Sequence, residues 1–128
     1  MNLCEMSPHV LAYLGDAVFE LRVRSMVVQS PGTVHDLRQK AEGFVSAKNQ
    51  SRMYFKLDEF LDDDEKSVLR RGRNSKPSSW ARSASMSDYK HATGLEALFG
   101  YLYLKGDTKR LDEIFEICVA ANEQQGEA

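Results

Sequence analysis

Two acidic residues, Asp16 and Glu96, stand in mostly apolar stretches of the sequence, over residues 10–21 and 93–98. Burying an uncompensated carboxylate is costly, so each acid needs a partner, a metal ion or an edge position that faces solvent. Helical spacing also permits a plainer interpretation, in which both acids lie exposed on the polar faces of amphipathic helices. The two acids are therefore candidates for a carboxylate site.

Glycine accompanies both acids: Gly15 precedes Asp16, while Gly94 and Gly100 flank Glu96. A glycine inside a helix costs about 1 kcal/mol relative to alanine. Small residues at these positions would let two helices approach closely and cross. The crossing would bring the two carboxylates to one Mg²⁺, which prefers oxygen ligands and keeps several waters.

The charge pattern offers a second candidate feature. The formal net charge of −2 argues against a generic nucleic-acid binder. Basic residues nevertheless gather over residues 70–90, directly after an acidic run over 58–65, and they are Arg70, Arg71, Arg73, Lys76, Arg82 and Lys90. The pattern indicates either two oppositely charged solvated faces or a phosphate-contacting loop on an otherwise acidic protein.

The elements that must position these residues are predicted to be helices. Apolar residues recur at helical spacing over 8–28, 33–41, 45–60, 62–72, 87–104 and from 108 onward. The stretch 74–87 holds Pro77 and several serines and predicts a long loop, often a functional element in a compact domain. No strand alternation or internal repeat is present, so we expect an all-α fold with six or seven helices, forming one domain over residues 1–128.

Three features of the sequence predict the cellular location of the protein. The two cysteines, Cys4 and Cys118, show no metal-ligand spacing and indicate a reducing compartment. The first residues lack a basic region followed by an apolar run. No apolar stretch reaches the roughly 20 residues that a membrane span needs. We therefore expect a cytoplasmic protein with no membrane partner.

Several sequence motifs resemble those of a known family. The run Leu-Ala-Tyr-Leu-Gly-Asp-Ala-Val at 11–18 resembles the signature helix of ribonuclease III domains, whose common form is Leu-Glu-Phe-Leu-Gly-Asp-Ala-Val. Glu96-Ala97-Leu98 with Gly100 resembles the second acidic motif of that family. Stretches 44–48, 69–74 and 89–93 are most similar to the Mini-ribonuclease III branch, which lacks a double-stranded-RNA-binding domain. The resemblance covers nearly the whole chain.

The resemblance implies a homodimer that cuts double-stranded RNA with a divalent metal, usually Mg²⁺, with Mn²⁺ as the other candidate. It implies that Asp16 and Glu96 are catalytic metal ligands and that cleavage leaves 5′-phosphate and 3′-hydroxyl ends. Two further carboxylates of the family fall here on Ala12 and Thr93, a loss that the Mini branch commonly shows. Glu20, one turn after Asp16, is a candidate auxiliary acid, although it could equally pair with a basic residue one turn later.

The RNA must then be held by the catalytic domain itself, through its shape and its phosphates. We expect the six basic residues of 70–90, together with Lys48, to make these contacts. The resemblance points to precursor large-subunit (23S) ribosomal RNA as the substrate, with a ribosomal protein as a further partner. The absence of acids at Ala12 and Thr93 leaves an alternative, a non-catalytic double-stranded-RNA or ribosome-associated binding module of the same fold. A purely structural helical dimer would leave the basic segment unexplained.

Overall fold

The computed structural model describes residues 2–77 and 85–126, with side chains up to 123. The described residues form six α-helices and two short 3₁₀ turns, which confirms the predicted all-α fold. In chain order the elements are η1 (Leu3–Glu5), α1 (Pro8–Val27), α2 (Val34–Val45), α3 (Ala47–Leu57), η2 (Asp58–Phe60), α4 (Asp63–Asn74), α5 (Met86–Lys105) and α6 (Thr108–Gly126).

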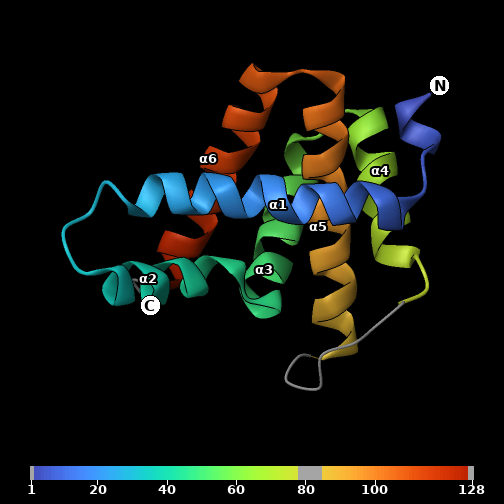
Figure 1. The fold of residues 1–128 in the computed structure, drawn as a ribbon. Coiled ribbons are helices and arrows are strands. Elements are labelled where there is room, and N and C mark those ends of the chain that lie inside the picture. Colours follow the sequence, from blue (N-terminus) through green and yellow to red (C-terminus); the bar gives the residue numbers. More distant parts are fainter. Residues whose placement is uncertain (1, 78–84, 127–128) are drawn as a thin grey trace.

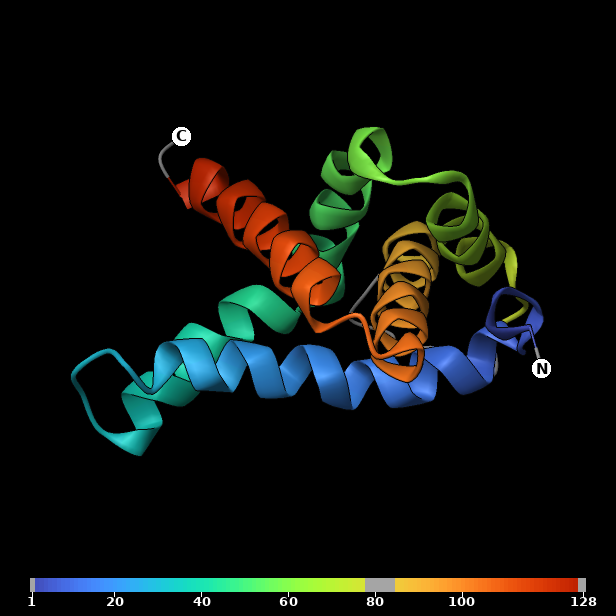
Figure 2. The same ribbon diagram turned by 90° about the horizontal axis from the view of Figure 1, so that it is seen from above.

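Helix α5 is the centre of the fold, and most of the other helices pack on it. Figure 1 shows α1 running across one face of α5, and Figure 2 shows α5 enclosed between α1 and α4. Helices α1, α3, α4 and α6 all contact α5, and α6 also packs on α3. Helix α2 lies beside the C-terminal half of α1 and has no fully buried residue. None of the described helices is long and apolar enough to cross a membrane.

Local signals fix most of the helix ends. Thr33 and Asp36 form a capping box at the start of α2, and Asp62 and Glu65 form another at the start of α4. Helix α5 ends at Gly106, whose φ of 77° is a left-handed conformation that glycine adopts without steric cost.

The predicted helix over 45–60 is wrong in its extent. Helix α2 continues to Val45, and Ser46 then caps α3 by accepting a hydrogen bond from the backbone of Asn49 at 3.3 Å. A serine that could sit inside a helix here ends one helix and begins the next. The last helix is capped by Asp107, whose side chain accepts a hydrogen bond from the backbone N–H of Arg110 at 3.1 Å.

Helix α1 carries two apolar faces, of which only one is buried in the fold. The buried face consists of Leu11, Ala12, Gly15, Phe19, Val23 and Val27. Val10 and Leu21 lie on the other face and are 54% and 67% exposed. A helix that packs on one side only typically has one apolar stripe, so the second apolar face of α1 is unusual.

The acidic run over 58–65 is largely explained by contacts within the fold. Glu65 is 2% exposed and receives two hydrogen bonds of 2.8 Å from Arg110 of α6. Burial acts to raise the pKa of Glu65, but the hydrogen bonds from Arg110 and the backbone of Asp62 outweigh it and lower that pKa. The pair ties the start of α4 to the start of α6, while Asp62 serves as a helix cap.

Glycines let α5 contact its neighbours backbone to backbone. A Cβ atom at Gly15 would overlap the carbonyl oxygen of Glu96, and one at Gly100 would overlap the carbonyl oxygen of Leu11. The predicted close approach of two helices is thus present between α1 and α5. Gly94 has a different role, because a Cβ there would lie 2.6 Å from the carbonyl oxygen of Leu69 in α4.

We predict that Gly15→Ala lowers the free energy of unfolding by about 1–3 kcal/mol or more, because the added methyl forces α1 and α5 apart. Gly43→Ala is the matched control: it lies in α2, and a Cβ there would meet no atom within 4 Å. That change should raise stability by about 0.5–1 kcal/mol. Urea denaturation followed by circular dichroism measures both. Equal effects of the two substitutions would contradict the close contact.

Candidate active site

Asp16 of α1 and Glu96 of α5 meet where the two helices cross. The backbone of Gly15 rests on the carbonyl of Glu96, so the next residue along α1 projects beside the Glu96 side chain. Asp16 acts on the pKa of Glu96 both through its charge and through a side-chain hydrogen bond, so the two carboxyl groups lie close together. Asp16 is exposed, while Glu96 is partly buried behind it. The expectation that crossing helices bring these acids together therefore agrees with the geometry.

The electrostatics of the pair are those of two acids without a counter-charge. Burial raises the pKa of Glu96, and the charge of Asp16 and its hydrogen bond raise it further, to about 8. The charge of Glu20 adds to this effect, and a hydrogen bond from Gln50 opposes it. Near neutral pH Glu96 consequently keeps a proton, which it holds against Asp16. A cation between the two carboxylates would oppose that shift, because it favours the ionised form of Glu96.

Gln50 of α3 is a residue of this site that the sequence analysis did not single out. It is 4% exposed, and its side chain acts to lower the pKa of Glu96. The available signal was its spacing, because Gln50, Met53, Tyr54 and Leu57 all lie on the buried face of α3. A single glutamine at a core position matches no known sequence motif, so the sequence alone does not mark it as a functional residue.

The two positions without acids contribute no ligand. Ala12 is 9% exposed and faces the core, and the Thr93 hydroxyl donates to the carbonyl oxygen of Tyr89 at 3.0 Å.

Glu20 pairs with Arg24, one turn further along α1, at 2.7 Å. That pair is the plainer of the two expectations for Glu20, and the role of an auxiliary acid stays a prediction.

The donor set at the crossing fits a single divalent ion that keeps most of its water. Within the described residues, no cluster of three or more His, Cys, Asp or Glu side chains could hold a metal. Asp16 and Glu96 offer two carboxylates, one exposed and one recessed, which are ligands that Mg²⁺ accepts alongside water and phosphate. The raised pKa of Glu96 shows that the pair lacks positive charge. These residues are therefore suited to hold Mg²⁺ or Mn²⁺.

The basic residues predicted to contact RNA differ in how freely they can do so. Arg71 donates to the backbone carbonyls of Cys4 and Glu5 and ties η1 to α4. Arg70 is exposed and pairs loosely with Asp58 at 3.4 Å. The Arg73 side chain donates to Asn74 at 3.0 Å. The other candidates are Lys48 and Lys76, both exposed, Lys90, partly buried, and Arg82, which lies outside the described residues.

These candidates come from helix ends that lie together. The start of α3, the end of α4 and the start of α5 lie at one end of the bundle, the lower end in Figure 1. Lys48 is in the first turn of α3, Arg73 is in the last turn of α4, and Lys90 is near the start of α5. These three basic residues therefore come from the same end of the fold.

Comparison with known proteins decides the family. The ribonuclease III domain model matches residues 9–107, which include both carboxylates and the crossing. The chain belongs to the ribonuclease III domain family. Two relatives named Mini-ribonuclease 3 are similar to it. The one from Clostridium tetani is 38% identical and spans 98% of this chain and 85% of its own length, and the one from Synechocystis is 44% identical and spans 88% and 77%.

A solved structure agrees with this assignment at the level of the fold. The crystal structure of protein FN1578 from Fusobacterium nucleatum superposes with a TM-score of 0.83 at 33% identity, over 97% of this chain and 96% of that one. The resemblance to ribonuclease III domains, and to the Mini-ribonuclease III branch among them, is thereby confirmed. So is the predicted enzyme class, an endoribonuclease.

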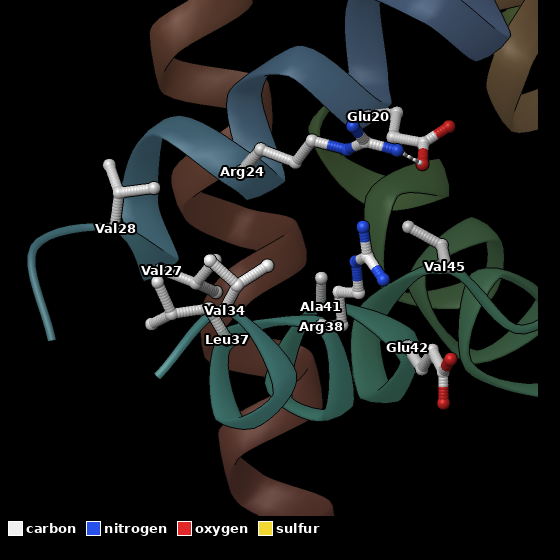
Figure 3. A pocket seen from close by; sticks show the side chains of 10 residues that line it. All are labelled: Glu20, Arg24, Val27, Val28, Val34, Leu37, Arg38, Ala41, Glu42 and Val45. Atoms are coloured by element: carbon white, nitrogen blue, oxygen red, sulfur yellow. Dashed lines mark hydrogen bonds and ion pairs between the residues drawn. The ribbon is translucent and has the colours of Figure 1, made fainter. Parts of the chain in front are cut away.

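This ribonuclease III domain also has a hollow next to the candidate site. It lies between α1 and α2 and has a volume of about 400 Å³. Figure 3 shows that its walls are mainly apolar side chains, while the Glu20–Arg24 pair stands at one edge. Glu20 thus separates the carboxylates at the crossing from an apolar surface further along α1.

We predict that the stability of the metal-free protein falls as the pH rises from about 4.5 to about 8. The pKa of Glu96 is raised in the folded protein, so between these values the folded state holds a proton that the unfolded chain releases. Added Mg²⁺ should stabilise the protein increasingly over the same window, because binding requires the ionised carboxylate.

Urea denaturation from pH 5 to 9, with and without Mg²⁺, measures both effects. Glu96→Gln is the matched variant, because it keeps the shape of the side chain and cannot ionise. It should flatten the metal-free profile and weaken the stabilisation by Mg²⁺. A wild-type profile that coincides with that of Glu96→Gln would show that Glu96 does not titrate in this range.

Proposed function

We propose that this chain hydrolyses phosphodiester bonds of double-stranded RNA in a Mg²⁺-dependent reaction that leaves 5′-phosphate and 3′-hydroxyl ends. The observation that carries the proposal is the contact of Asp16 with Glu96 at a crossing that two glycines hold closed. Membership of the ribonuclease III domain family supports it. Mn²⁺, which accepts similar oxygen ligands, is expected to replace Mg²⁺.

The two carboxylates have different parts in this scheme. Asp16 is exposed and stands where a phosphate group of the RNA backbone can approach. Glu96 is recessed, and the backbone contact of Gly15 fixes its position relative to Asp16. A bound divalent ion supplies positive charge beside the attacked phosphate and a water of lowered pKa. Asp16 and Glu96 would hold that charge in place, and Glu96 would give up its proton when the site is filled.

The basic residues at the lower end of the bundle are proposed to hold the duplex. The A-form helix is recognised by its shape and through phosphate and 2′-hydroxyl contacts, so exposed cations without strong partners suit the task. Arg70 meets this description, because an exposed pair such as Arg70–Asp58 is worth no more than about 1 kcal/mol. Arg71 is the weakest candidate of the set, since its guanidinium is already bound to backbone carbonyls.

The physiological role is proposed from the branch to which the chain is similar. We propose that it acts in the cytoplasm on precursor large-subunit (23S) ribosomal RNA, with a ribosomal protein as a further partner. The relatives named Mini-ribonuclease 3 support the branch. We propose that residues 1–128 form one catalytic domain, which contains both the Asp16–Glu96 site and the basic helix ends.

We further propose that the working form is a homodimer with one site in each protomer. The support is the second apolar face of α1, which lies opposite the core. Its residues recur at helical spacing and include Val10 at 54% exposed, Tyr13 at 86%, Leu21 at 67% and Val28 at 61%. A stripe of large exposed apolar side chains marks an interaction surface. Two sites related by a twofold axis would cut both strands.

The activity is tested with purified protein, long duplex RNA and Mg²⁺. We expect the wild type to cut the duplex and to leave single-stranded RNA of the same sequence intact. Asp16→Asn and Glu96→Gln should each lower the rate at least about 100-fold, because each removes a metal ligand. Glu116→Gln is the control, since Glu116 is an exposed acid of α6 and should have no effect.

Two results would overturn the proposal in different ways. Duplex RNA that stays intact at every Mg²⁺ and Mn²⁺ concentration, while the protein binds it, would favour the non-catalytic module. Cleavage that is equally fast in Asp16→Asn would place the chemistry elsewhere. Raising the salt should weaken duplex binding steeply if several of the basic residues contact phosphates.

The homodimer is tested by light scattering after size-exclusion chromatography. Leu21→Lys should shift the protein toward a monomer, because it places a charge in the apolar stripe of α1. Leu104→Lys is the matched control: Leu104 is 44% exposed but lies at the end of α5, away from that stripe. A wild-type monomer, or equal behaviour of the two variants, would contradict the proposed interface.

A further inference from the structure

An exposed aromatic ring lies on α3 beside the start of α5. The Phe55 side chain is 62% exposed, yet two other rings hold it in place. Its ring centroid lies 5.4 Å from that of Tyr54 and 4.6 Å from that of His91 on α5. Because Tyr54 is 3% exposed and His91 is 9% exposed, both contacts come from the core side. The opposite side of the Phe55 ring is therefore open to solvent.

The imidazole of His91 is fixed by contacts of its own. Its Nδ1 atom lies 2.7 Å from the carbonyl oxygen of Ser87, one turn earlier in α5, and Nδ1 donates because a carbonyl oxygen can only accept. The imidazole also contacts Tyr54, with ring centroids 4.6 Å apart. The Phe55 ring consequently rests on an aromatic support that joins α3 to α5.

The helix that carries this ring is basic. Helix α3 contains three basic residues, Lys48, Arg52 and Lys56, and no acidic one, although the net charge of the chain is −2. Lys56 pairs with Glu59 at 4.0 Å. Lys48, Arg52 and Phe55 follow one another at helical spacing, so they share one side of the helix. We call these three residues the α3 face, and its charge suits a polyanion.

The mixture of cations and an aromatic ring favours RNA over a protein partner. Lysine is depleted in protein–protein interfaces, whereas Lys48 and Arg52 can both contact phosphates. The ring narrows the choice further. Bases within a duplex are stacked on one another and present only their edges in the grooves, so an aromatic side chain stacks on a base that is unpaired. Such stacking tolerates every base, because each has an aromatic face.

The α3 face also lies close to the candidate active site. His91, which contacts Phe55, precedes Glu96 by one and a half turns of α5. That separation is roughly 7–8 Å along the helix axis at about 1.5 Å per residue. An RNA strand with its attacked phosphate at Asp16 and Glu96 would pass the α3 face within a few nucleotides.

We propose that the α3 face binds an unpaired nucleotide next to the duplex, with its base stacked on Phe55 and its phosphates in contact with Lys48 and Arg52. The inference rests on the proposed function and narrows its substrate class. The preferred RNA is a duplex that carries an unpaired nucleotide close to the cleavage site.

The test measures RNA binding without divalent metal, so that cleavage does not interfere. A set of duplexes carries one unpaired nucleotide each, at successive positions, and the fully paired duplex is the reference. The wild type should bind the duplex with the nucleotide in the right position about 5- to 100-fold more tightly than the reference. An abasic nucleotide at that position, which keeps the phosphate and lacks the base, should remove the preference.

The key variant is Phe55→Leu, which keeps an apolar side chain against Tyr54 and His91 and removes the aromatic face. It should lose the preference and bind the fully paired duplex as tightly as the wild type does, whereas Phe55→Trp should keep the preference. Phe60→Leu is the matched control, because Phe60 is 47% exposed but lies on η2, next to two acidic residues. It should change neither affinity.

Three results would overturn the proposal. A wild type that binds every duplex of the set no more tightly than the reference has no subsite for an unpaired nucleotide. A preference that survives in Phe55→Leu, or with the abasic nucleotide, does not come from stacking on Phe55 and leaves the ring to a protein partner or to no partner. Equal weakening of all duplexes in Phe55→Leu would show that the ring contacts paired RNA.

The outcome also separates this inference from the proposed function. A protein that shows the preference but cuts no duplex with Mg²⁺ would refute the activity and leave the stacking subsite. A protein that cuts duplex RNA but shows no preference would refute only the subsite. A protein that binds no RNA would refute both.

Discussion

The contact between the backbones of α1 and α5 is the constraint on which the rest of the structure depends. Gly15 and Gly100 permit it, because a methyl group at either position would overlap a carbonyl oxygen of the opposite helix. The contact orients α1 across the centre of the fold, and α3 and α4 then pack on other faces of α5. It also sets the spacing of Asp16 and Glu96, since each belongs to the turn of helix that makes the contact. The packing and the site therefore have one cause.

The chemistry of the site follows from the way this contact brings the carboxylates of Asp16 and Glu96 together. Helices that cross at an ordinary distance would leave room for water between the carboxyl groups, whereas this crossing presses them together and partly buries one of them. The pKa of Glu96 rises to about 8 as a result. A divalent ion bound here, as proposed, would compete with a proton for the Glu96 carboxylate and would relieve the repulsion between the two acids. The exposed side of Asp16 leaves the site open to a phosphate.

Much of this arrangement could be predicted from the sequence, because the signals involved are local. The capping boxes at Thr33 and Asp62, the helical periodicities and the glycines beside the two acids all lie within a few residues of the features they determine. The features that the sequence did not predict depend instead on contacts between residues far apart in the chain. Which apolar face of α1 is buried depends on α5, and the engagement of Arg71 depends on carbonyls more than sixty positions away. Gln50 went unnoticed because its meaning comes entirely from Glu96, on another helix.

The central claim is that the Asp16–Glu96 contact is a cation site. The most direct measurement is anomalous diffraction from crystals grown with Mn²⁺ above pH 8, where the Glu96 carboxylate is ionised. The account predicts one strong anomalous peak between the two carboxylates of the wild type, at Mn–O distances typical of carboxylate ligation, and no peak there in Asp16→Asn. Mn²⁺ bound elsewhere on the surface, with the two carboxyl groups still in contact with each other, would contradict it.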